Sequence, residues 1–173
     1  MRRPAPRTVA LPSGERVVLR AVEPADALLV VEFVAGLSPT TRYRRAFTPF
    51  RSLPPEVIRR LVEVDFERDM ALIAVQRGAD GREAMMGASR YVRDLEGDGA
   101  EFALTVADRW HRQGLGSRLM QALIEEARAR GVDCLHGLVL RSNRPMVALA
   151  RRLGFKVSAV RGDATTVEAV KEI

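Results

Sequence analysis

Two glycines, Gly114 and Gly116, separate an apolar run over 100–106 from the long amphipathic segment that follows them. The apolar run predicts a strand, and leucines at 115, 119 and 123 predict a helix. A strand followed by a glycine turn and a helix start points several backbone N–H groups at one place, which favours phosphate binding. Without side chains at the two glycines, an anion can approach the backbone closely.

Two other nucleotide-binding motifs are excluded at this turn. The third glycine of a dinucleotide-binding fingerprint would fall at Leu119, and the chain has no Gly-Lys-Ser or Gly-Lys-Thr for the phosphate loop of nucleotide hydrolases. On its own, a Gly-x-Gly at a helix start is also consistent with an ordinary tight connection between a strand and a helix.

An acidic residue, Glu101, lies in the strand predicted just before the turn. Alternation along a strand places Glu101, Ala103 and Thr105 on one face and the larger apolar residues on the other. Small neighbours leave space around the carboxylate, so this residue is a candidate general base. A solvated glutamate at the start of a strand is the alternative interpretation.

The remaining periodic segments indicate the elements that position these residues. Helix signals occur at a helix opened by Pro24, a short helix capped by Ser38, and the segments 53–65, 114–130 and 143–153. Strand patterns occur over 14–20, 70–75, 84–92, 100–106, 134–140, 155–160 and 165–170. This order predicts a mixed α/β fold, with one domain over 13–173 and a flexible basic arm over 1–12.

Composition narrows the class of protein. The 173-residue chain is long enough for one domain with a core. One cysteine and two histidines provide neither an internal disulfide nor a good zinc site. The longest apolar stretch is interrupted by Glu32, and the N-terminus lacks the apolar run of a signal peptide. We therefore expect no metal, no membrane span, and a reducing cytoplasm.

The net charge of +6 is concentrated in the first third of the chain. Residues 1–60 contain eleven arginines and five acidic residues, whereas the rest of the chain is neutral overall. Such a segment can attract nucleic acid, an acidic partner or the phosphates of a cofactor. No nucleic-acid-binding motif accompanies the arginines. We therefore favour a solvated basic surface and do not expect nucleic-acid binding.

Several sequence blocks resemble the GNAT superfamily of N-acetyltransferases. More narrowly, they are similar to the acetyltransferase domain of bacterial protein-lysine acetyltransferases. The resemblance implies a GNAT fold, with a mixed, mostly antiparallel sheet of about six or seven strands and helices on both faces. The matching blocks are residues 37–39, 43–44, 69–75, 100–106, 110–116, 143–146 and 153–155.

The resemblance implies acetyl-CoA as the cofactor, bound at the glycine turn and along the preceding strand. His111 departs from the family pattern, which has Gln or Arg at this position. Because the family binds the pyrophosphate mainly through backbone N–H groups, this departure need not abolish binding. The implied cofactor-binding residues are Leu104, Thr105, Val106, His111, Arg112, Gln113, Gly114, Leu115, Gly116, Ser117, Asn143 and Met146.

The resemblance also implies a direct acetyl transfer within a ternary complex. Glu101 corresponds to the glutamate that acts as general base, and the backbone N–H near Val106 would stabilise the oxyanion. The acceptor would be a primary amine, with protein lysine preferred over a small-molecule amine. Many family members have a tyrosine as general acid where this chain has Ala150. Cys134 could form an acetyl-cysteine, but a core cysteine is the preferred interpretation.

Two questions stay open at this stage. A non-catalytic acetyl-CoA sensor would keep the same turn and resemblance without transferring the acetyl group. The sequence does not distinguish a monomer from a homodimer.

Overall fold

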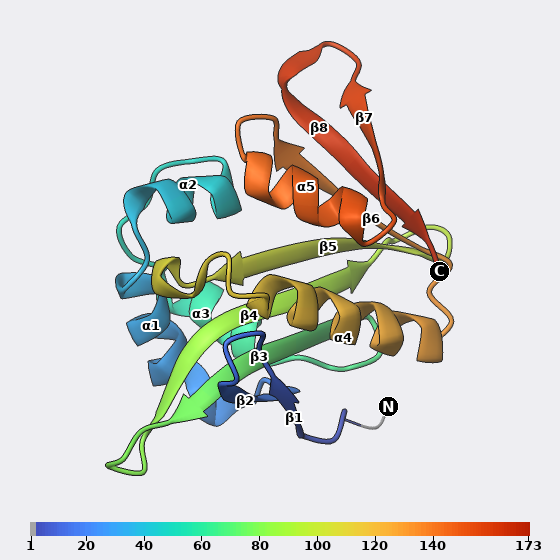
Figure 1. Cartoon of the computed structure of the whole chain (residues 1–173). Helices are drawn as coiled ribbons and strands as arrows, with labels where there is room; N and C mark the ends of the chain where they lie inside the picture. Colours follow the sequence, from blue (N-terminus) through green and yellow to red (C-terminus); the bar gives the residue numbers. More distant parts are fainter. Residues whose placement is uncertain (1–2) are drawn as a thin grey trace.

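All strands of the described residues, 3–173, form a single sheet in the computed structural model (Figure 1). Their order is β1-β2-β3-β4-β5-β6-β8-β7, and all neighbouring pairs are antiparallel except β5 and β6. The strands are β1 (Arg7–Ala10), β2 (Arg16–Ala21), β3 (Asp69–Arg77), β4 (Glu83–Arg93), β5 (Gly99–Val106), β6 (Cys134–Leu140), β7 (Lys156–Val160) and β8 (Asp163–Glu172).

Helices cover both faces of this sheet, with α4 on one face and α1 and α3 on the other (Figure 1). The predicted mixed α/β class with a mostly antiparallel sheet is therefore confirmed. The helices are α1 (Ala27–Ala35), α2 (Pro39–Ala46), α3 (Pro55–Val62), α4 (Leu115–Ala129) and α5 (Arg144–Arg152), with short 3-10 helices η1 (Pro24–Asp26) and η2 (Asp108–Trp110).

The first strand corrects one expectation. The sequence predicts a flexible arm over 1–12, but β1 pairs with β2 from Arg7 opposite Leu19 to Ala10 opposite Arg16. Leu11, next to β1, is 3% exposed and belongs to the core. With β1, the sheet has more strands than the predicted six or seven. The sequence does not indicate β1, because pairing through main-chain hydrogen bonds does not need a long apolar run. Residues 1 and 2 of the predicted arm lie outside the described residues.

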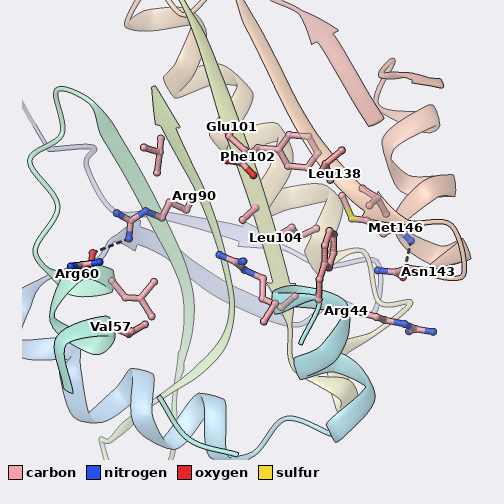
Figure 2. Close-up of a pocket in the computed structure, with 17 residues that line it drawn as sticks. Arg44, Val57, Arg60, Arg90, Glu101, Phe102, Leu104, Leu138, Asn143 and Met146 are labelled. Atoms are coloured by element: carbon pink, nitrogen blue, oxygen red, sulfur yellow. Dashed lines mark hydrogen bonds between the residues drawn. The ribbon is translucent and has the colours of Figure 1, made fainter. Parts of the chain in front are cut away.

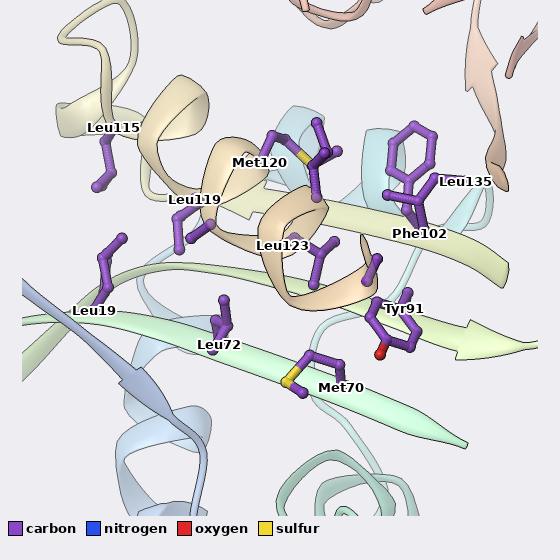
Figure 3. Close-up of a cluster of buried hydrophobic side chains, with 14 of the residues drawn as sticks. Leu19, Met70, Leu72, Tyr91, Phe102, Leu115, Leu119, Met120, Leu123 and Leu135 are labelled. Atoms are coloured by element: carbon purple, nitrogen blue, oxygen red, sulfur yellow. The ribbon is translucent and has the colours of Figure 1, made fainter. Parts of the chain in front are cut away.

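β3 explains how the two helical layers are held together. Its residues Met70 and Leu72 belong to the cluster that packs under α4, whereas Ile73 and Val75 belong to the cluster under α1 and α3. Figure 3 shows the first of these clusters, in which α4 lies over the sheet. A strand buried on both faces needs a continuous apolar run, which is why 70–75 lacks polar alternation.

One carboxylate joins α2 to the turn after β5. Asp108 of η2 accepts hydrogen bonds from the Ser38 N–H at 2.9 Å, the Ser38 hydroxyl at 2.6 Å and the Thr41 hydroxyl at 2.8 Å. Ser38 is also the N-cap of α2 and accepts from the Thr41 N–H. Although partial burial opposes ionisation, these hydrogen bonds and nearby His111 lower the pKa of Asp108 to about 2. Asp108 therefore holds η2, which follows β5, against the first turn of α2.

The packing of α4 predicts that alanine substitutions at two leucines lower the free energy of unfolding by very different amounts. Leu123 of α4 is fully buried in the core, whereas Leu28 on α1 is 64% exposed. Leu123→Ala should lower the free energy of unfolding by about 2–5 kcal/mol, because it removes buried methyl groups and leaves a cavity. Leu28→Ala, the matched control, should change it by less than about 0.5 kcal/mol. Urea denaturation of both variants measures the two values, and equal losses would contradict this packing.

The Asp108 cluster predicts a pH-dependent contribution to stability. Its folded pKa lies below the value of about 3.9 expected for an unfolded aspartate. The contribution is therefore complete above about pH 4 and is lost as the pH falls towards 2. Asp108→Asn should be less stable than the wild type at pH 7, by no more than about 1 kcal/mol because the carboxylate is exposed.

Urea titrations between pH 7 and pH 3 test this expectation. The difference between Asp108→Asn and the wild type should shrink below about pH 4. Asp98→Asn is the control, because the Asp98 side chain is exposed and makes no hydrogen bond within residues 3–173. A difference that stays constant with pH would show that the charge of Asp108 is not what matters.

Candidate active site

The site begins where β5 and β6 separate. Their parallel pairing covers only Gly99 to Glu101 against Cys134 to His136. Beyond it, a Cβ atom on Gly137 would lie 3.0 Å from the Phe102 ring and 3.1 Å from its carbonyl oxygen. Glycine is therefore needed for the close approach of the two strands at the point of divergence.

The divergence opens a cleft of about 550 Å³ between β5, β6, α2, α3 and the start of α5 (Figure 2). This volume lies in the range of small-molecule and cofactor sites. The lining is Arg44, Arg45, Ala46, Phe47, Val57, Arg60, Leu61, Arg90, Val92, Glu101, Phe102, Ala103, Leu104, Leu138, Val139, Asn143 and Met146.

The edge of β5 that faces the cleft carries unpaired peptide groups. The Ala107 N–H donates to the Met86 carbonyl at 2.9 Å, which marks this opposed pair as hydrogen-bonded. Because such pairs alternate along an antiparallel ladder, Leu104 and Val106 point their N–H and C=O groups away from β4. These groups face the side from which β6 has diverged. The Val106 carbonyl accepts a hydrogen bond from His111, so the Leu104 peptide groups and the Val106 N–H are the ones available to a ligand that lies along β5.

Glu101 lies at the inner end of the cleft, at the last residue of β5 that pairs with β6 (Figure 2). Its side chain is exposed, and Ala103 next to it on the same strand face leaves the carboxylate accessible. Arg45 of α2 interacts electrostatically with both Glu101 and Arg90 of β4. An accessible carboxylate inside a cleft of ligand size has the placement that a general base needs.

Backbone N–H groups collect at the other end of β5. Arg112 and Gly114 both adopt left-handed conformations, with φ of 61° and 83°, which fold the chain back towards α4. The Arg118 N–H is the first to bond within the helix, to the Gly114 carbonyl at 3.2 Å. In the described chain, the N–H groups of 112–117 find no backbone acceptor. Several free N–H groups at the N-terminus of a 15-residue helix suit an anionic group.

Three side chains of the turn hold its shape. The His111 Nε2–H donates to the Val106 carbonyl at 2.8 Å, and the Gln113 amide donates to the Arg109 carbonyl at 2.7 Å. The Ser117 hydroxyl accepts from Arg152 at 3.2 Å. These side chains therefore stabilise the backbone that presents the N–H groups.

The two glycines of the turn also have packing roles. A Cβ atom on Gly114 would lie 2.8 Å from Pro12 of the β1–β2 hairpin, in a backbone region that already disfavours L-residues. On Gly116, it would lie 3.3 Å from Leu149 and 3.4 Å from Leu104. Gly116 therefore allows the first turn of α4 to lie close to both α5 and β5, in addition to the predicted access for an anion.

The other predicted cofactor residues separate into distinct places. Leu104, Asn143 and Met146 line the cleft, and the Asn143 side chain accepts from the Met146 N–H as the N-cap of α5. Thr105 lines a neighbouring cavity instead. The Leu115 side chain is fully buried in the core, so only the backbone of this residue can reach a ligand.

That neighbouring cavity, the apolar chamber, has a volume of about 360 Å³ and lies on the α1 and α3 side of the sheet. It shares Arg45, Arg90 and Ala103 with the cleft, so the two spaces adjoin next to Glu101. No sequence pattern indicates this chamber, and the four arginines of the cleft come from segments far apart in the chain. Its walls include Val30, Phe33, Phe50, Leu53, Ile73 and Met85.

The structure supports neither an acetyl-cysteine intermediate at Cys134 nor a general acid at position 150. Desolvation and the carboxylates of Asp94 and Asp133 raise the pKa of the half-buried Cys134 thiol, which disfavours the nucleophilic thiolate. The Ala150 side chain is 1% exposed and has no proton to donate.

Within residues 3–173, no group of His, Cys, Asp and Glu side chains is arranged to hold a metal ion. No helix there is both long and apolar enough to span a membrane.

Known proteins share this architecture. Residues 40–155 match the family described as "Acetyltransferase (GNAT) family". "Acetyltransferase PA5475" of Pseudomonas aeruginosa is 31% identical over 158 residues, which cover 91% of this chain and 84% of that protein. "Acetyltransferase Pat" of Mycolicibacterium smegmatis is 35% identical over 150 residues, covering 86% of this chain and 44% of that protein. The chain thus spans less than half the length of this second relative.

A solved structure extends the likeness to the whole fold. The GNAT domain of S. lividans PAT superposes with a TM-score of 0.89 and covers 99% of this chain and 100% of that domain, at 24% identity. The family match covers more than half of the chain, and the first relative is similar over most of both lengths. The chain therefore belongs to the acetyltransferase (GNAT) family and is an N-acetyltransferase.

Proposed function

We propose that the protein transfers the acetyl group of acetyl-CoA directly to a primary amine, preferably a protein lysine, in a ternary complex. The observation that carries this proposal is the placement of Glu101 in a cleft bordered by the unpaired edge of β5. A base, a set of backbone donors and a space for both substrates occur together there. The resemblance to protein-lysine acetyltransferases supports lysine as the acceptor.

The cofactor would lie along β5. The free N–H groups of 112–117 would hold its pyrophosphate. The Leu104 peptide groups and the Val106 N–H would pair with its pantetheine arm as an additional strand would. Asn143 and Met146 at the start of α5 form the opposite wall of the cleft. This route leads from the turn towards Glu101, so the acetyl group would arrive beside the carboxylate.

Glu101 would remove a proton from the acceptor ammonium, whose free pKa is about 10.4. The freed nitrogen bonds to the thioester carbonyl carbon while the C–S bond breaks, and the departing thiolate takes the second nitrogen proton directly or through water. Backbone N–H groups on the open edge of β5 would stabilise the carbonyl oxygen as it gains negative charge. With Ala150 at the family's tyrosine position, no side chain there serves as general acid.

The surface position of the cleft supports a macromolecular acceptor. Phe47, Val92 and Leu138 line it and remain 37%, 41% and 49% exposed. A lysine side chain that projects from another protein can enter such an open cleft without requiring the acceptor to be enclosed.

Glu101→Gln tests the base. The substitution keeps the shape of the side chain but removes its basicity, so kcat/KM should fall by about 10²–10⁴-fold. The loss should become smaller as the pH is raised, because more of the amine is already deprotonated. Release of the CoA thiol from acetyl-CoA, in the presence of a lysine peptide, measures both effects.

Glu96→Gln is the matched control, since Glu96 is exposed in the loop between β4 and β5 and lies outside the cleft. It should retain the wild-type rate. Equal rates for Glu101→Gln and the wild type would exclude Glu101 as the base. Tight acetyl-CoA binding without turnover on peptide or small-molecule amines would instead favour the non-catalytic sensor.

A further inference from the structure

Arginines from three separate elements line the cleft that contains Glu101. The cleft contains Arg44 and Arg45 of α2, Arg60 of α3 and Arg90 of β4, and Glu101 is its one acidic side chain among the described lining residues (Figure 2). Three of these arginines belong to the basic first sixty residues, whose charge excess the proposed reaction does not use.

Little of this charge is compensated by the protein. Arg90 forms an ion pair with Asp69 and donates to the Arg60 carbonyl at 3.0 Å. Arg44, Arg45 and Arg60 form no ion pair with a carboxylate of residues 3–173. Although Arg45 as a whole is exposed, desolvation and Arg90 lower the pKa of its guanidinium, and Glu101 only partly opposes this. The cleft therefore has an excess of positive charge.

Two arginines outside the cleft are paired with carboxylates. Arg20 is bound by both carboxylate oxygens of Asp26 and by Glu83, each at 2.8 Å. Arg7 pairs with Glu125 at 2.6 Å. Arg44, Arg45 and Arg60 have no such carboxylate within residues 3–173, so a ligand in the cleft can supply the negative charge that pairs with them.

Two of these arginines lie beside the Glu101 carboxylate, Arg90 through strand pairing and Arg45 through its electrostatic interaction. Arg90 is directly opposite Ala103 on the neighbouring strand, and Ala103 shares its strand face with Glu101. The free N–H groups for the cofactor phosphates lie beyond the other end of β5, in 112–117. The amine must approach the Glu101 carboxylate, so it comes close to Arg45 and Arg90 rather than to the turn at 112–117.

We propose, on the basis of the proposed function, that the acceptor lysine lies in an acidic peptide segment whose carboxylates bind Arg44, Arg45 and Arg60. Carboxylates beside the lysine compensate the arginines and draw the segment into the cleft.

Three peptides of equal length test the proposal with the intact protein. One lysine is flanked on both sides by Glu, Gln or Arg, and initial rates are measured with saturating acetyl-CoA. The acidic peptide should have a kcat/KM about tenfold above the neutral one, as expected for two or three exposed charge pairs. The basic peptide should be the poorest, and the differences should shrink as salt is added.

Arg44→Gln and Arg60→Gln should each reduce the advantage of the acidic peptide by about two- to fivefold, without changing the KM for acetyl-CoA. Arg59→Gln is the matched control, because Arg59 neighbours Arg60 on α3, is exposed and does not line the cleft. It should preserve the wild-type preference.

Two results would overturn the acidic preference alone. One is equal kcat/KM for the three peptides. The other is a raised KM for acetyl-CoA in Arg44→Gln or Arg60→Gln, which would assign the arginines to the cofactor phosphates. Lack of turnover on every peptide would overturn lysine acceptance as well, so the two failures are distinguishable.

Discussion

Parallel hydrogen bonding between β5 and β6 ends at Glu101 and His136, so the two strands share the sheet at one end and part at the other. The separation leaves peptide groups of β5 without partners on one edge and makes the space that α5 borders. Glu101 lies where the two strands begin to separate, and the turn at 112–117 follows the other end of β5. A complete ladder between the two strands would remove both the cleft and the donors that line it.

Long periodic elements and the position of Glu101 could be predicted from the sequence, because a buried stripe or an alternating strand restricts nearly every residue in it. Predicted 114–130 and 134–140 correspond to α4 and β6. β1 escaped prediction because its pairing depends on main-chain bonds rather than on apolar side chains. The role of Ser117 depends on Arg152, a contact between residues 35 positions apart that local patterns do not encode.

The locations of the charged side chains also could not be predicted from the sequence. The excess of arginine in the first sixty residues is visible in the sequence, but its location depends on how α2 and α3 fold over the sheet. Arg20 and Arg7, from the same segment, are paired with carboxylates, while Arg44, Arg45 and Arg60 have no such partner within residues 3–173. The same count of charges could therefore have produced an evenly solvated surface.

Asp108 gives these two halves of the site a mechanical connection. Its carboxylate is bonded to the first turn of α2, and it lies on the segment that leads into the phosphate turn. A displacement of either element strains the same three hydrogen bonds. The position of α2 relative to the turn after β5 therefore depends on the Asp108 carboxylate remaining bonded to both Ser38 and Thr41.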